Sequence, residues 1–141
     1  MSDKYLSVAF SSEMFKVKPI ILKTVEFIRM NLDSIDENDL YDLRLIFSEL
    51  LVNAVIHGNK NDSHKFVNLS VELENDSVSS VISDEGSGFD HTALLAEARS
   101  NKNIFSERGR GIMLVHSLAD SMAYNAAGNE IKFCKKVNVN G

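Results

Sequence analysis

The sequence lacks the features that mark secreted proteins. It contains a single cysteine, Cys134, so no internal disulfide can form. It has no basic start followed by an apolar stretch, the pattern of a signal peptide. We therefore expect a cytoplasmic protein in a reducing compartment, with Cys134 buried as a small hydrophobe.

The sequence also has little positive charge and no long hydrophobic run. It contains 15 Lys and Arg against 20 Asp and Glu, a formal net charge of -5. Surfaces that bind nucleic acid or anionic lipid need clustered Lys and Arg, so this balance disfavours both partners. No apolar run approaches the roughly 20 residues that cross a bilayer. We expect no direct nucleic acid contact and no membrane contact, and we favour a protein partner or a small ligand.

The 141 residues, 44% of them hydrophobic, suit one compact domain covering residues 1–141. No internal repeat, low-complexity tract or linker divides the chain. The apolar spacing predicts, in order, a strand, two helices, two strands, a short helix, a mobile loop, a long helix and two strands. The strands are expected at 4–10, 66–74 and 77–84, with two more within 123–137. The helices are expected at 20–32, 37–57, 92–100 and 111–122, and the mobile loop at 101–111.

This element order is typical of a two-layer α/β (α+β) sandwich, with an antiparallel or mixed sheet and helices on one face. Turn residues support the boundaries. Pro19 fits a first helical turn, and Gly58 is placed as the C-terminal stop of the second helix. Asn75 and Asp76 suit a tight hairpin. Such a sandwich leaves room for a pocket between its layers.

The stretch SELLVNAVIHGN, residues 48–59, carries a polar seam on an apolar helix. Glu49, Asn53 and His57 follow at four-residue steps, which drift by only about 40° around a helix. A carboxylate and an amide oxygen one turn apart suit Mg²⁺, or one can hold the ion while the other acts as a base. Alternatively, both are solvent-facing or hydrogen-bonded helix residues. His57 fits a C-terminal cap interaction.

A glycine-rich stretch, DEGSGFD, follows a predicted strand at residues 84–90. Asp84 can accept a hydrogen bond from an exocyclic amine. Gly86 and Gly88 allow the backbone to approach a flat ligand closely. Taken alone, the stretch is also compatible with an ordinary turn.

A second such stretch, ERGRGI at residues 107–112, joins the predicted loop to a helix start. Gly109 and Gly111 would expose backbone N–H groups there, and Arg108 and Arg110 add positive charge, which suits a phosphate. A structural helix start with solvent-facing arginines is the alternative. The letters match neither the P-loop nor the Rossmann pattern.

Together ELLVNAVIHGN, DEGSGFD and RGRGI resemble the N, G1 and G2 boxes of the GHKL (Bergerat-fold) ATPases, most closely the bacterial anti-sigma factor serine kinases. The resemblance covers nearly the whole chain. It implies the Bergerat ATP-binding fold, with ATP or ADP and Mg²⁺ held between sheet and helices. The roles it implies are Glu49 as general base, Asn53 as magnesium ligand, Asp84 as adenine reader, Gly86 and Gly88 as close-approach glycines, and Arg108, Gly109, Arg110, Gly111 and Ile112 as the phosphate-binding end of a lid.

The late strand departs from the commonest family pattern. It contains Gly128, Asn129 and Glu130 where many members have a threonine beside the adenine. The resemblance therefore makes Asn129 a candidate adenine contact.

The resemblance implies an ATP-dependent serine/threonine protein kinase that acts as an anti-sigma factor in partner switching. Its substrate would be a STAS-domain anti-sigma antagonist and its second partner a sigma factor. A homodimer, formed through the sheet edge near the first strand, is also implied. Two alternatives stay open: a nucleotide-gated binding switch with little or no phosphorylation, and a kinase that activates a PPM-type phosphatase.

Overall fold

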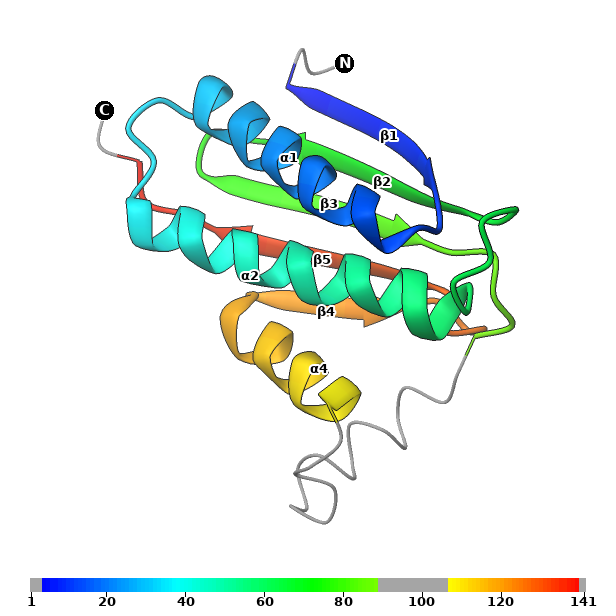
Figure 1. Cartoon of the computed structure of the whole chain (residues 1–141). Coiled ribbons are helices and arrows are strands. Elements are labelled where there is room, and N and C mark those ends of the chain that lie inside the picture. Colours follow the sequence, from blue (N-terminus) through cyan, green and yellow to red (C-terminus); the bar gives the residue numbers. More distant parts are fainter. Residues whose placement is uncertain (1–3, 89–106, 140–141) are drawn as a thin grey trace.

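The chain forms a five-stranded antiparallel sheet with its helices packed on one face (Figure 1). The computed structural model describes residues 4–88 and 107–139, and in the second range it describes side chains from residue 110 onward. The strand order is β1-β2-β3-β5-β4, and all of these pairings are antiparallel. The strands are β1 (Tyr5–Ser11), β2 (Phe66–Leu73), β3 (Ser77–Ser83), β4 (Ser121–Tyr124) and β5 (Glu130–Lys136).

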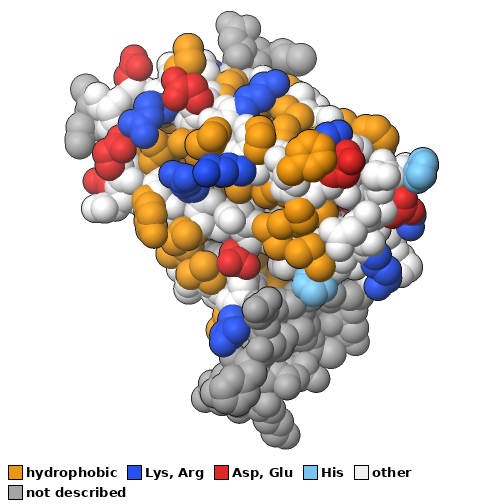
Figure 2. Space-filling model, viewed as in Figure 1, with side chains coloured by type: hydrophobic (Ala, Val, Ile, Leu, Met, Phe, Trp, Pro, Cys, Tyr) orange, Lys and Arg blue, Asp and Glu red, His pale blue; other side chains and the backbone are white. Residues whose placement is uncertain are grey.

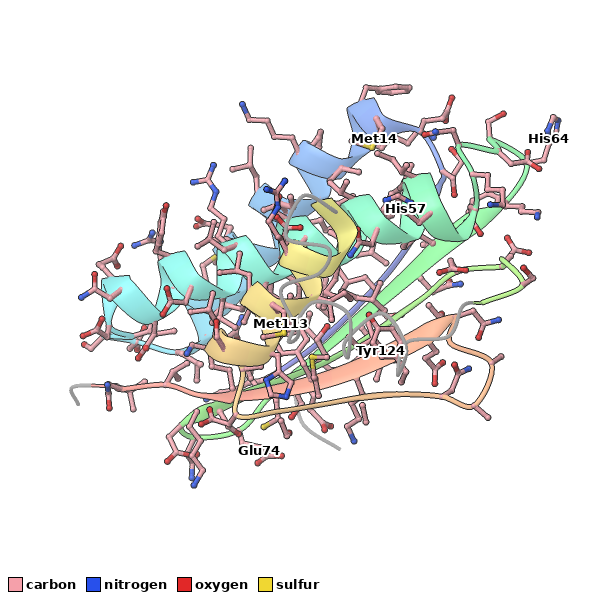
Figure 3. The ribbon with its side chains drawn as sticks, turned by 90° about the horizontal axis from the view of Figure 1, so that it is seen from below. Met14, His57, His64, Glu74, Met113 and Tyr124 are labelled. Carbon is pink, nitrogen blue, oxygen red and sulfur yellow. The ribbon has the colours of Figure 1, made fainter. Side chains whose placement is uncertain are left out.

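The helical layer contains three described α-helices. A short 3-10 turn, Met14–Lys16, leads into the first of them. They are α1 (Val17–Asn31), α2 (Glu37–Asn53) and α4 (Glu107–Leu118). Figures 1 and 3 place all three on the same side of the sheet, with α2 between α1 and α4. The predicted two-layer sandwich is confirmed. Of the two sheet types expected, antiparallel or mixed, the antiparallel one is observed.

The core lies between the sheet and the helices. Residues of β2 alternate between the faces, so that Val67, Leu69 and Val71 are buried. The rings of Phe47 in α2 and Phe133 in β5 meet edge to face, with their centroids 5.4 Å apart. This packing fixes α2 against the sheet and thereby determines where its polar side chains point.

Helix α2 begins where the sequence predicts and ends differently. The Asp36 carboxylate caps it by accepting hydrogen bonds from the N–H groups of Asn38 at 2.7 Å and Asp39 at 3.3 Å. At the other end the α-helix stops at Asn53, and Ala54–Gly58 forms a π-helical turn. Gly58 does end the helical segment, but the left-handed conformation follows it, at residues 60 and 61.

Two other helices differ from their expected ranges. Helix α1 begins at Val17, so Pro19 lies inside its first turn. Helix α4 covers 107–118 instead of 111–122, because packing against α2 outweighs the helix cost of its glycines. It ends early because the N–H of Asp120 donates to the carbonyl of Cys134, which turns the chain into β4. The expected helix at 92–100 lies outside the described residues.

Hydrophobic side chains are exposed on the helical layer, where Figure 2 shows them among Lys and Arg. Phe15, in the 3-10 turn before α1, is 72% exposed. Cys134 is half-buried and not in the core, because its neighbours Phe133 and Lys135 take the inward positions of β5. Among the described residues, no helix is long and apolar enough to cross a membrane.

Candidate functional site

A cavity of about 460 Å³ opens between the C-terminal half of α2 and the start of α4. Glu49 and Asn53 of α2 and His57 of the π-helical turn all line it, so the three residues of the polar seam face one space. Arg110 and Gly111 line it from α4. The cavity therefore brings a carboxylate, an amide and a guanidinium together from two helices.

Asn53 also carries an unmet hydrogen-bonding group. Its Nδ2 atom is buried and has no hydrogen-bond partner among the described residues. A buried polar atom left unpaired costs about 1–3 kcal/mol, so a polar partner at Nδ2 of Asn53 would stabilise the fold. The O and N atoms of an amide can exchange places, so the orphaned position suits either a donor or an oxygen ligand for a cation.

A second, narrower cavity lies on the sheet side of Asn53. Its volume is about 30 Å³, room for about one water molecule. Asp84, Tyr124 and Asn129 line it together with Asn53. In Figure 3, His57 marks the helix side of the site and Tyr124 the sheet side. Asn53 thus lines both the 460 Å³ cavity and the narrow cavity, so one ligand that reaches into both would contact it.

The loop after β3 is held tightly against the end of α2. The Asp84 carboxylate accepts a hydrogen bond from the N–H of Gly86 at 2.8 Å. A side chain at Gly58 would overlap this carboxylate, and one at Gly86 would overlap the carbonyl of Gly58. Gly88 has φ +85° and lies against the carbonyl of Ala127, so any larger residue there is strained. The glycines let two backbone segments touch.

Asn129 locks this loop to the β4–β5 turn. Its Nδ2 donates to the carbonyl of Gly86 at 3.1 Å, and its Oδ1 accepts from Nδ2 of Asn125 at 2.8 Å. Both ends of the amide therefore have partners within the protein. Asn129 lines the narrow cavity, but its described contacts are those of a loop-holding residue.

Gly111 lies inside α4 and not at its start. Gly111 is the fifth residue of α4, so its N–H lies beyond the first four, which have no partner within a helix. A side chain at Gly111 would overlap the carboxylate of Glu49. Ile112 beside it is buried, at 1% exposure. Gly109 and Arg108 belong to the first turn of α4, where side chains are not described.

Two residues near this site, Tyr124 and Asn59, were not predicted from the sequence. Tyr124 lines the narrow cavity because it takes an inward position of β4, a signal that becomes readable only once the strand is placed. Asn59 is 1% exposed and bonds to the loop after β3, although it falls in a polar stretch that predicts a surface loop.

The resolved pKa shifts lie away from these cavities. A hydrogen bond from the backbone N–H of His64 lowers the pKa of the Asp62 carboxyl. A hydrogen bond from Ser11 and contact with Lys16 lower the pKa of Glu13. Within residues 4–88 and 107–139, no three His, Cys, Asp or Glu side chains group as metal ligands.

The fold is an α+β sandwich, with one cavity between two of its helices and a second, narrower one between α2 and the sheet. The family model described as the histidine kinase-like ATPase domain matches residues 10–135. The chain belongs to this family, as the resemblance predicted.

Relatives agree with the match over most of their length. The chain is 33% identical to the serine-protein kinase RsbW of Staphylococcus epidermidis over 137 residues, covering 86% of each protein. It is 28% identical to RsbW of Staphylococcus aureus over 132 residues, covering 84% of this chain and 83% of the relative. It is 27% identical to the anti-sigma F factor of Clostridium beijerinckii over 143 residues, covering 99% of each.

Proposed function

We propose that the chain is an ATP- and Mg²⁺-dependent serine/threonine protein kinase that acts as an anti-sigma factor. Its substrate would be a STAS-domain anti-sigma antagonist, and its other partner a sigma factor. The observation that carries the proposal is the convergence of Glu49, Asn53 and Arg110 on one cavity, with a buried amide atom of Asn53 unpaired. The names of the RsbW and anti-sigma F relatives support a serine-protein kinase and a sigma factor as partner, and the STAS-domain antagonist follows from the family resemblance alone.

The proposed chemistry is transfer of the γ-phosphoryl group to a hydroxyl. The hydroxyl oxygen of the substrate Ser or Thr bonds to the γ-phosphorus, the bond to the bridging oxygen of ADP breaks, and Glu49 accepts the hydroxyl proton. Glu49 is half-buried and lies one helical turn from Asn53, so it can face a hydroxyl presented at the mouth of the cavity.

The other residues bind and orient the nucleotide. Asn53 would contribute an oxygen ligand to Mg²⁺, an ion that takes few protein ligands and, when bound, offsets charge on the phosphate oxygens. Arg110 lies where it can offset charge on the transferring group. Asp84, which lines the narrow cavity, would accept a hydrogen bond from the adenine amino group.

Radiolabelled ATP mixed with candidate antagonists tests the proposal. Label should appear on a Ser or Thr of the antagonist and should disappear with Glu49→Ala. The matched control is Glu37→Ala, which removes a 71%-exposed glutamate from the far end of the same helix and should leave labelling unchanged. Nucleotide-dependent binding of a partner without label would overturn the kinase and support a binding switch.

A further inference from the structure

Asn59 is a buried amide whose hydrogen bonds connect four separate segments. Its Nδ2 donates to Ser12 Oγ at 2.6 Å and to the carbonyl of Phe66 at 2.9 Å. Its Oδ1 accepts from the N–H of Glu85 at 2.7 Å, and its own N–H donates to the carbonyl of Ala54 at 2.8 Å. The side chain is therefore fully used inside the protein, at 1% exposure.

One of these bonds reaches the backbone between Asp84 and Gly86. Asn59 fixes the N–H of Glu85, and the Glu85 carboxylate accepts a hydrogen bond from the N–H of Phe66. The Asp84 carboxylate next to it is pressed against Gly58, the residue preceding Asn59. One amide thus sets the distance between the loop after β3 and the end of α2.

We propose that Asn59 is a positioning residue that holds Asp84 in place and thereby sets the preference of the site for adenine over other purines. This inference rests on the proposed function, in which Asp84 accepts a hydrogen bond from the adenine amino group. A carboxylate selects for that amino group only if its position is fixed, because a displaced acceptor can turn to other donors or to water. The N–H of Asp84 donates to the carbonyl of Asn129 at 2.9 Å, and beyond that bond the loop lacks regular structure, so its position toward α2 depends on side-chain bonds such as the one from Asn59.

The chain offers a control within the same network. Asn59→Ala removes the bond to Glu85 together with the bonds to Ser12 and Phe66. Ser12→Ala removes only the branch toward β1 and leaves the Glu85 bond in place. Both changes affect buried polar groups, so both should lower the melting temperature, but only the first should release Asp84.

The test is calorimetric binding of ADP and of inosine diphosphate, whose base lacks the amino group, to the full chain with Mg²⁺. Wild type and Ser12→Ala should prefer ADP. Asn59→Ala should bind ADP about tenfold more weakly, and the ratio of its affinities for ADP and inosine diphosphate should fall toward one. Amide exchange at Glu85 should also become faster without nucleotide. Asn59→Ser, which is too short to span the same bonds, replaces Asn59→Ala if that variant does not fold.

Two results would overturn the inference in different ways. An Asn59 variant that melts earlier but keeps the full preference for ADP would make Asn59 a core amide with no part in selectivity. Wild-type protein that binds neither diphosphate would remove the proposed function itself, and this is distinguishable because it appears without any substitution.

Discussion

At the scale of single residues, Gly111 shows how a missing side chain serves the site. It lies inside α4 with its Cα beside the Glu49 carboxylate, and no larger residue fits without moving that carboxylate. A Cβ at position 111 would displace the carboxylate of Glu49, which is the end of a flexible side chain. The backbone can therefore keep its fold, but the carboxylate cannot keep its position.

Gly111→Ala should therefore separate stability from activity. Alanine favours a helix interior by about 1 kcal/mol over glycine, so the free energy of unfolding should be unchanged or slightly higher. Phosphoryl transfer should fall about 100-fold, since a displacement near 1 Å costs that much at a reacting group. Urea denaturation and labelling measure the two effects.

A double variant checks the cause of this loss. If Gly111→Ala acts by displacing Glu49, adding it to Glu49→Ala should cost no further activity. A further large loss in the double variant would mean that Gly111 acts through the nucleotide or the helix instead.

At the scale of elements, α2 links the core to the site. Its capped start at Asp36 and its packing through Phe47 hold it in place, and its last turns present Glu49 and Asn53 to the cavity. The π-helical turn that follows brings Gly58 against Asp84, a contact that a continued α-helix would not have placed in the same way.

Asp36→Ala should weaken α2 from its far end. Loss of the two cap bonds should lower the free energy of unfolding by about 0.5–2 kcal/mol. Labelling per folded molecule should be unchanged, because the site lies at the opposite end. Asp33→Ala, an exposed acidic residue in the same connection, is the control for charge alone. Equal losses in both variants would contradict a role for capping.

At the scale of the whole molecule, the candidate site couples ligand binding to stability. Asn53 lines both cavities, so the nucleotide of the proposed function would contact α2 from two sides. Any ligand that binds only the folded chain raises its stability by mass action.

ADP at about 100 times its dissociation constant should raise the free energy of unfolding by about 2.7 kcal/mol. Part of this gain should require Mg²⁺, and that part should vanish in Asn53→Ala. Thermal melts with Mg²⁺ and with a chelator measure both. A melting curve that ADP leaves unmoved under both conditions would contradict nucleotide binding.

The order of the elements and most of their ranges could be predicted from the sequence. Alternation in 66–73 and helical spacing in 37–53 are local patterns, and each identifies its element because one face must be buried. The end of the long late helix could not be predicted, because a bond between Asp120 and strand β5 decides it.

The candidate site divides in the same way. The sequence by itself determined which residue types were available: a carboxylate, an amide and glycines at spacings that bring them to one helix face or one loop. Only the tertiary structure decided that Asn53 joins two cavities, that Tyr124 forms a wall, and that Asn59 ties the Asp84 loop to α2. The reason is physical, since periodicity is a property of neighbouring residues, whereas a cavity and a buried hydrogen bond exist only between segments that folding brings together.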